Sequence, residues 1–286
     1  MKRTKMLIAK IIITIAAAYG VVVALIAIMQ TSIIFPTAVA DAQAPVLPAD
    51  AIRLKLKTTG GERLVGTHLR PQAHLRPQGG GQGRGQADRL LVLGFGGNAA
   101  NADGLALYLR TLFPEAHVVT FSYRGYSPST GAPSAAALLV DSLKVHDFAV
   151  RSIKPRRVVA VGFSIGSGVA AYLAKHRDLA GLILVTPFDS LTAVARGHYP
   201  WAPVGLLLRH KVPTIEFVRG RPTPTAVIAS ERDNIIPARH AEALKPAIPN
   251  LVFDRTIAGV GHNDLYNDPG FLAAMTEALA RFKGDK

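Results

Sequence analysis

The pentapeptide Gly-x-Ser-x-Gly at residues 162–166 most constrains what this chain can fold into. The apolar run at 158–161 precedes it, and a helix-forming segment at 169–176 follows it at once. Strand, sharp turn and helix in that order are typical of a nucleophile elbow, which lifts a serine hydroxyl above the edge of a sheet. Glycines at 162 and 166 fit because side chains there would collide where strand and helix approach closely. We therefore predict Ser164 as a nucleophile, with the first helical N–H groups facing the group it attacks.

Short apolar runs alternate with amphipathic segments through most of the chain. They predict an antiparallel pair of strands, six further strands, and five helices between and after those six. The predicted pair lies at 52–57 and 63–69; the further strands at 89–93, 117–122, 157–161, 181–185, 225–229 and 252–257; the helices at 102–113, 134–153, 165–176, 238–245 and 269–282. Strands that alternate with helices of this length are typical of an α/β fold, a mostly parallel sheet with helices on both faces.

The N-terminal segment predicts a membrane anchor. Residues 11–29 carry no charge, and 19 residues are close to the ~20 that a helix needs to cross the hydrocarbon core. The cations within residues 1–10 precede this segment, and the next Lys or Arg is Arg53, so the N-terminus is expected in the cytoplasm and the rest beyond the membrane, in the periplasm of a Gram-negative cell. A cleaved signal peptide, cut after Ala40, is the alternative, but the apolar core exceeds the 7–15 residues typical of one.

The remaining chain is expected to consist of a tether and one globular domain. Residues 30–50 are interpreted as the tether, and 51–286 as the domain. Within that domain, prolines interrupt two short helical patterns around 191–196 and 204–210, which indicates a small cap at 187–224 over the carboxyl ends of the strands. A glycine-rich insert at 71–88, preceded by a repeat that carries His68 and His74, is interpreted as a low-complexity loop rather than a metal site.

A serine hydroxyl needs a base, and the base needs an acid that orients it. In this architecture the acid and the histidine follow the serine in that order, each just after a later strand. Only His262 follows the last predicted strand. Gly259 and Gly261 precede it, which suits a loop that approaches the serine. Asp233 is the predicted acid because it lies in the loop after the penultimate predicted strand, at 225–229. Further candidates for the acid are Asp189, which could equally cap a helix, Glu231 and Asp264.

Acyl transfer also needs two donors for the developing oxyanion. One predicted donor is the backbone N–H of Ile165, the residue after the nucleophile. The other is the N–H of Asn98, in the glycine-rich loop 94–101, with Gly97 and Ala99 as neighbouring choices. Asn101 or Asp103 is expected to cap the following helix. The glycines of this loop do not match a dinucleotide-binding fingerprint, so we expect no cofactor.

Composition narrows the function further. The formal net charge is +14, which favours anionic surfaces such as lipid head groups or nucleic acid. No basic run is interleaved with aromatic residues, so we interpret the charge as a solvated surface beside a membrane and expect no nucleic acid partner. The chain has no cysteine, which excludes disulfides and cysteine-ligated metals, and we expect no metal at the site. Nothing in the sequence indicates an oligomeric state.

The chain resembles the α/β-hydrolases, and within them the membrane-anchored branch that includes lysophospholipases and protein depalmitoylases. The resemblance covers residues 30–36, 97–99, 123–127 and 162–166, together with Asp233 and residues 261–262. It implies the α/β-hydrolase fold and the roles already predicted for Ser164, Asp233 and His262, with oxyanion donors near Asn98 and Ile165. One departure is Gly96, where many relatives have a histidine that shapes the oxyanion loop.

These observations predict a membrane-anchored serine hydrolase that cleaves carboxylic esters through an acyl-enzyme. The expected substrate is an acyl lipid or another apolar ester, because the chain carries an anchor, a basic surface and an apolar cap. The same three side chains would serve an amide hydrolase of the aminopeptidase kind. A non-catalytic anchored binding protein on the same scaffold is the third alternative.

Overall fold

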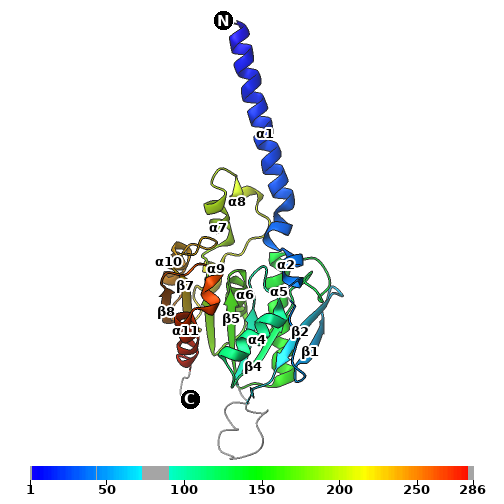
Figure 1. Ribbon diagram of the computed structural model, residues 1–286, viewed down its shortest axis with the longest axis vertical. Coiled ribbons are helices and arrows are strands. Elements are labelled where there is room, and N and C mark those ends of the chain that lie inside the picture. The colour runs from blue at the N-terminus through cyan, green and yellow to red at the C-terminus, as the bar shows by residue number, and fades with distance from the viewer. Residues whose placement is uncertain (1, 43, 73–89, 283–286) are drawn as a thin grey trace, which may run out of the picture.

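The computed structural model describes residues 2–42, 44–72 and 90–282. Within these residues, eight strands form one sheet in the order β1-β2-β4-β3-β5-β6-β7-β8 (Figure 1). β1 pairs antiparallel with β2 and β2 with β4, whereas the strands from β4 to β8 run parallel. The strands are β1 (Ile52–Lys57), β2 (Arg63–Leu69), β3 (Leu90–Phe95), β4 (His117–Phe121), β5 (Arg157–Phe163), β6 (Gly181–Val185), β7 (Thr225–Ser230) and β8 (Leu251–Ile257).

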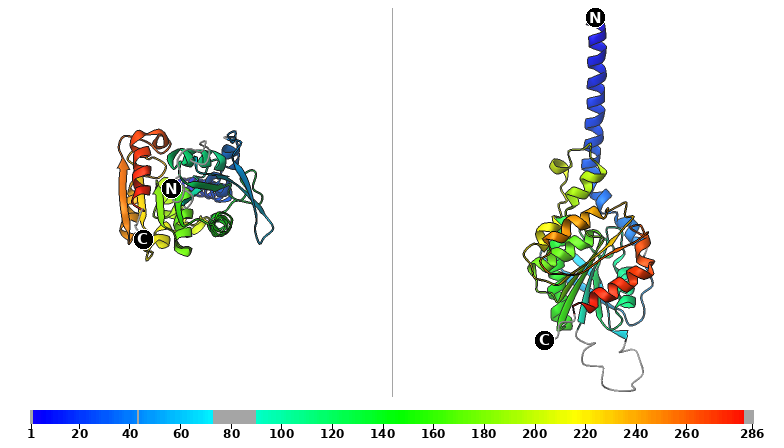
Figure 2. Two further views of the ribbon diagram at one scale, coloured as in Figure 1. Left: turned by 90° about the horizontal axis from the view of Figure 1, so that it is seen from below. Right: turned by 90° about the vertical axis from the view of Figure 1, so that its left-hand side faces the viewer.

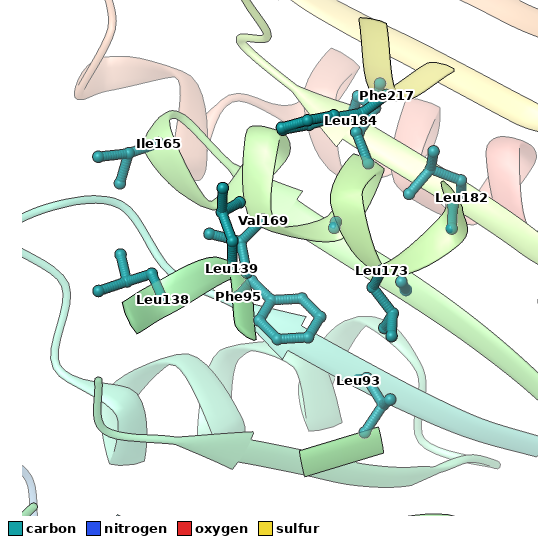
Figure 3. Close-up of a cluster of buried hydrophobic side chains, with 14 of the residues drawn as sticks. Leu93, Phe95, Leu138, Leu139, Ile165, Val169, Leu173, Leu182, Leu184 and Phe217 are labelled. Atoms are coloured by element: carbon teal, nitrogen blue, oxygen red, sulfur yellow. The ribbon is translucent and has the colours of Figure 1, made fainter. Parts of the chain in front are cut away.

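Helices cover both faces of this sheet, and successive strand residues divide between two cores. In β5, Val158 and Ala160 pack into one core, and Val159 and Val161 into the other. Because strand side chains alternate between faces, a strand buried on both sides needs an unbroken apolar run. One face holds α4 (Ala102–Leu112) and α11 (Pro269–Ala280); the other holds α5 (Ala135–Ile153), α6 (Ile165–His176), α9 (Thr214–Val218) and α10 (Arg239–Leu244). Figure 3 shows the core beneath α6.

The predicted strands and helices agree with this architecture, and β6 and α6 coincide with their predicted bounds. Three short elements differ from the prediction: α9 and the 3₁₀ turns η2 (Lys245–Ala247) and η3 (Asp264–Asn267). Each is five residues or fewer, too short for a helical period to appear in a sequence. In the predicted cap, at 187–224, the helices are α7 (Leu191–His198), α8 (Val204–Leu207) and α9, and α9 packs into the core beside α6. The glycine-rich insert and His74 lie largely or wholly outside the described residues.

The N-terminal helix α1 (Lys2–Ile34) projects from the domain (Figures 1 and 2). Among the described residues it is the one helix long and apolar enough to cross a membrane, with a mean hydropathy of 2.8 over its apolar window. It extends beyond the predicted span of 11–29 at both ends.

The segment after α1 differs from the expected tether, because it packs onto the domain. It contains α2 (Thr37–Asp41), and Phe35 and Ala40 are each only 2% exposed. The Phe35 ring meets that of His210 edge-on at 5.0 Å, and Asn101 donates from its amide to the carbonyl of Ala40. Burial of these apolar side chains holds the base of α1 in a fixed place on the domain.

Backbone contacts at two glycines set the turn between β5 and α6. A Cβ at Gly162 would meet the backbone of Gly166 and Ser167 in the first turn of the helix. A Cβ at Gly166 would meet the carbonyl oxygens of Phe95 and Gly96, at the end of the neighbouring strand β3. The predicted steric role of both glycines is therefore confirmed, although Gly166 makes room for β3 rather than for β5.

This crowding predicts opposite effects of alanine at two glycines. Gly162→Ala should lower the free energy of unfolding by about 1–3 kcal/mol, because backbone has to move to admit the methyl group. Gly104→Ala, in α4, is the matched control: its Cβ would meet only Asn101 Cβ at 3.9 Å, and alanine should stabilise the helix by up to ~1 kcal/mol. Thermal unfolding in detergent, followed by circular dichroism, measures both. An unchanged midpoint for Gly162→Ala would contradict the close packing.

Candidate active site

Ser164 occupies the tight turn between β5 and α6. Its φ of 53° and ψ of −120° lie in a region that residues with a Cβ rarely adopt, so the turn is strained. Its backbone N–H donates to the carbonyl of Val185 on β6 at 3.0 Å, which holds the turn on the sheet. Although Ser164 stands at the N-cap position of α6, its hydroxyl makes no capping bond to the helix. The hydroxyl is therefore not committed to the helix end, as a nucleophile requires.

His262 and Asp233 form a buried hydrogen-bonded pair. Asp233 follows β7 and His262 follows β8, and His262 Nδ1 lies 2.6 Å from Asp233 Oδ2. The other carboxylate oxygen, Oδ1, accepts the backbone N–H groups of Ile235 at 2.9 Å and Ile236 at 2.7 Å. These bonds fix the carboxylate, and the carboxylate orients the imidazole, so that Nε2 is the nitrogen left to act on another group.

The loops after β7 and β8 are joined to each other, which explains why the pair forms. Ser230 donates from its hydroxyl to the carbonyl of Val260 at 2.6 Å, and the Arg232 N–H donates to the same carbonyl at 2.9 Å. Glu231 accepts the N–H of Gly259 at 2.7 Å. The carboxylate of Glu231, an alternative acid in the sequence, therefore supports the loop beside His262 rather than the imidazole.

Asp189, the main alternative acid, pairs with a different histidine. Its Oδ1 lies 2.8 Å from Nδ1 of His240 on α10, a contact that no sequence pattern indicated. It also does not cap α7, because Ser190 does: the Ser190 hydroxyl accepts the N–H of Ala193 at 3.0 Å. Asp264, the remaining alternative, is exposed in η3.

The loop between β3 and α4, where the second oxyanion donor is predicted, lies against the serine. A Cβ built on Gly97 would be 3.6 Å from Ser164 Cβ, so the backbone next to Asn98 passes close to the nucleophile. Asn101 caps α4, as expected, by accepting the N–H groups of Asp103 and Gly104. Ile165 is the first residue of α6, so its N–H is one of the unpaired donors at the start of that helix.

Two tyrosines after β4 hold this loop, a role that sequence reasoning missed. The Tyr123 hydroxyl donates to the carbonyl of Gly96 at 2.9 Å, and the Tyr126 hydroxyl donates to that of Asn98 at 2.7 Å. Burial raises the pKa of both phenols, so they stay neutral donors. Gly96 stands where the resemblance associates a histidine with loop shape, and here the Tyr123 bond fixes that position.

Aromatic packing brings the histidine loop beside the serine turn. Tyr266, four residues after His262, has its ring centroid 5.8 Å from that of Phe163, the residue before Ser164. Burial, and secondarily the charge of Asp233, raise the pKa of Tyr266 to about 12. The serine turn, the acid–base pair and the glycine loop thus all follow carboxyl ends of parallel strands and gather at one edge of the sheet.

No group of three His, Asp or Glu side chains in the described part of the chain could hold a metal ion. His68, which lies in β2 rather than in a loop, has its Nε2 2.9 Å from Nδ1 of His117. Burial, followed by the nearby His117, lowers the pKa of His68 to about 4, so His68 stays neutral near pH 7.

Comparison with known proteins identifies the fold. Residues 90–214 match the family described as alpha/beta hydrolase fold. Esterase Pf2001 of Pyrococcus furiosus has a related structure, with a TM-score of 0.63 and 14% identity over 84% of this chain and 95% of that one. Est1E of Butyrivibrio proteoclasticus, solved with ferulic acid, gives a TM-score of 0.63 and 16% identity over 79% and 98% of the two chains. The chain therefore has the alpha/beta hydrolase fold, and the predicted fold class is confirmed.

The curated relatives of this chain include a membrane protein and a lipase. An uncharacterized protein of Mycobacterium tuberculosis is 37% identical over 169 residues, 58% of this chain and 59% of that protein. An uncharacterized membrane protein of Saccharomyces cerevisiae is 30% identical over 57% of this chain and 60% of its own length. Lysophosphatidylserine lipase ABHD12 of Danio rerio is 32% identical over 40% of this chain and 32% of its own length. The matches span less than two thirds of these relatives, and the predicted resemblance is confirmed.

The tyrosine contacts predict how firmly the glycine loop is held. Tyr123→Phe removes the donor to the Gly96 carbonyl, and a buried acceptor without a partner costs about 1–3 kcal/mol. Amide hydrogen exchange of residues 96–101, followed by mass spectrometry, should become faster, because the free energy of opening this loop falls by that amount. Tyr172→Phe is the control, since that ring packs on His176 and Phe217 instead. Equal exchange in both variants would show that the Tyr123 hydroxyl does not hold the loop.

Proposed function

We propose that this chain is a serine hydrolase that cleaves carboxylic esters at the edge of the sheet where Ser164, His262 and Asp233 meet. The observation that carries the proposal is the buried 2.6 Å bond between His262 and Asp233, on loops that lie beside a strained serine turn. A paired imidazole and carboxylate alone are common in proteins. Their place next to a serine with positive φ and an open hydroxyl is what acyl transfer requires.

The proposed reaction follows from the roles of these atoms. Ser164 Oγ attacks the carbonyl carbon of the ester while its proton passes to His262 Nε2. The negative oxygen that forms accepts the backbone N–H groups of Asn98 and Ile165, and Asp233 stabilises the imidazolium. The alcohol leaves with the proton from His262, which gives an acyl-enzyme on Ser164. A water molecule, deprotonated by the same imidazole, then releases the acid.

The proposed substrate is an acyl lipid or another apolar ester, and the proposed location is a membrane. The apolar helix α1 supports both, because it would hold the site close to a bilayer. Relatives that are lysophosphatidylserine lipases support a lipid substrate by similarity. Lys2, Arg3, Lys5 and Lys10 support a cytoplasmic N-terminus with residues 51–286 on the opposite side, and residues 42–50 as the remaining tether.

Labelling by a fluorophosphonate probe tests the nucleophile. The wild-type chain should react covalently, because the probe is attacked by an activated serine, and Ser164→Ala should not react at all. Ser152→Ala is the control, since Ser152 is an exposed serine on α5 whose hydroxyl bonds only to the Phe148 carbonyl. Gel fluorescence and peptide mapping measure the result. Labelling that persists in Ser164→Ala would contradict the assignment and favour the view of the fold as a binding scaffold.

Two asparagine variants separate the two candidate acids, Asp233 and Asp189. Asp233→Asn should lower kcat for a p-nitrophenyl acyl ester by roughly 10⁴-fold, the effect that loss of this carboxylate has in serine proteases. Asp189→Asn should change kcat only severalfold, because its histidine partner, His240, is not His262. The reverse ranking would reassign the acid. Faster turnover of aminoacyl anilides than of esters would instead favour an amide substrate.

A further inference from the structure

The cap contacts α1 from its base at Gln30 up to its middle at Tyr19. The Tyr19 hydroxyl donates to the carbonyl of Trp201 at 2.8 Å, and their rings lie 6.1 Å apart. Near the domain, Gln30 donates to the carbonyl of Leu207 at 3.2 Å and accepts the N–H of Arg209 at 2.7 Å. Figures 1 and 2 show the cap rising beside the helix in both side views. Contacts at two levels fix the cap relative to α1.

The cap segment that rises along α1 has the chemistry of a buried surface but is exposed. Residues 199–208 carry no charge; Arg196 and Arg209 bracket them in the sequence, and the Arg196 guanidinium lies beside Gly205. At its tip Leu206 is 83% and Trp201 47% exposed. Five backbone N–H groups of the segment donate to carbonyls within it: those of Ala202, Val204, Leu206, Leu207 and Leu208. Internal pairing of this kind is what a backbone needs where water is excluded.

The contact at Tyr19 sets the depth of this tip. From Gln30 to Tyr19 the helix covers about 16 Å, at ~1.5 Å per residue. If the span of α1 ends near residue 29, where the polar residues 30–32 begin, the tip lies about half-way into a hydrocarbon core of ~30 Å. There the Tyr19 hydroxyl and the Trp201 carbonyl satisfy each other, and Arg209 stands at the level of the head groups, where its exposed guanidinium can meet a lipid phosphate.

An apolar groove runs between α1 and the cap. It has a volume of about 100 Å³, and its walls include Val23, Ala27, Tyr199, Val204 and Leu208. The one amide side chain in its lining, Gln30, has both ends of its amide bonded to protein. Water in such a groove would find apolar surface on almost every side, whereas a lipid acyl chain would fill it.

We propose that residues 199–208 of the cap are immersed in the same leaflet as the domain-proximal half of α1, with lipid acyl chains against Trp201 and Leu206 and in the groove between cap and helix. The cap is thereby a second membrane contact, and it places the domain at a fixed depth. This inference rests on the membrane anchoring in the proposed function and not on the chemistry of Ser164.

Trp201 is the only tryptophan of the chain, so its fluorescence reports the tip directly. The full-length chain is reconstituted into phosphatidylcholine vesicles with either ordinary or brominated acyl chains. We expect brominated lipid to reduce the emission severalfold and dissolved iodide to leave it nearly unchanged, because the ring lies among acyl chains. Quenching by iodide and not by bromine would overturn the proposal.

A double variant supplies the control. Trp201→Phe with Ser152→Trp moves the reporter to an exposed position at the far end of α5, and there iodide should quench and bromine should not. Alkaline carbonate extraction of the same vesicles shows whether a negative result comes from the anchor or from the cap. A chain that resists extraction but keeps Trp201 in water has the anchor without the immersed cap. Release by carbonate would overturn both the anchor and this inference, while fluorophosphonate labelling of Ser164 would stand independently.

Discussion

The close approach of backbone at the start of α6 is the constraint on which the rest of this molecule depends. With no side chains at 162 and 166, the first helical turn lies directly on β5 and on the end of β3. That approach forces Ser164 into a positive φ, frees its hydroxyl from the helix, and brings the glycine loop to the serine. The neighbouring buried strands hold this strained turn in place, since β5 pairs with β3 and β6 along its length.

Polar contacts around this turn form a second layer that fixes the loops beside Ser164. Tyr123 and Tyr126 hold one loop by its carbonyls, and Ser230 and Arg232 hold another. Every one of these bonds ends on backbone, so they fix loop position without using the side chains assigned to chemistry. Asp189 bonds to His240 and Asp233 bonds to His262, so the two carboxylates do not compete for one imidazole.

The sequence predicted the parts of this structure that local patterns control. Apolar runs identified the buried strands because both faces of the sheet are covered, and the pentapeptide identified the turn because only glycine fits there. The tether was partly wrong, since burial of Phe35 and Ala40 depends on surfaces far away in the chain. The tyrosine bonds, the His240 pair and the grip of the cap on Tyr19 join residues 27 to 182 positions apart, and no local pattern indicates such contacts.

The central claim is that Ser164, His262 and the N–H groups of Asn98 and Ile165 converge on one reacting atom. The most direct measurement is an experimental structure of the full chain after reaction with an organophosphonate. We expect phosphorus bonded to Ser164 Oγ, His262 Nε2 within hydrogen-bond reach, about 3 Å, of an oxygen on the adduct, and the phosphoryl oxygen facing both N–H groups. An adduct on another residue, or an imidazole of His262 turned away from the phosphorus, would contradict the account.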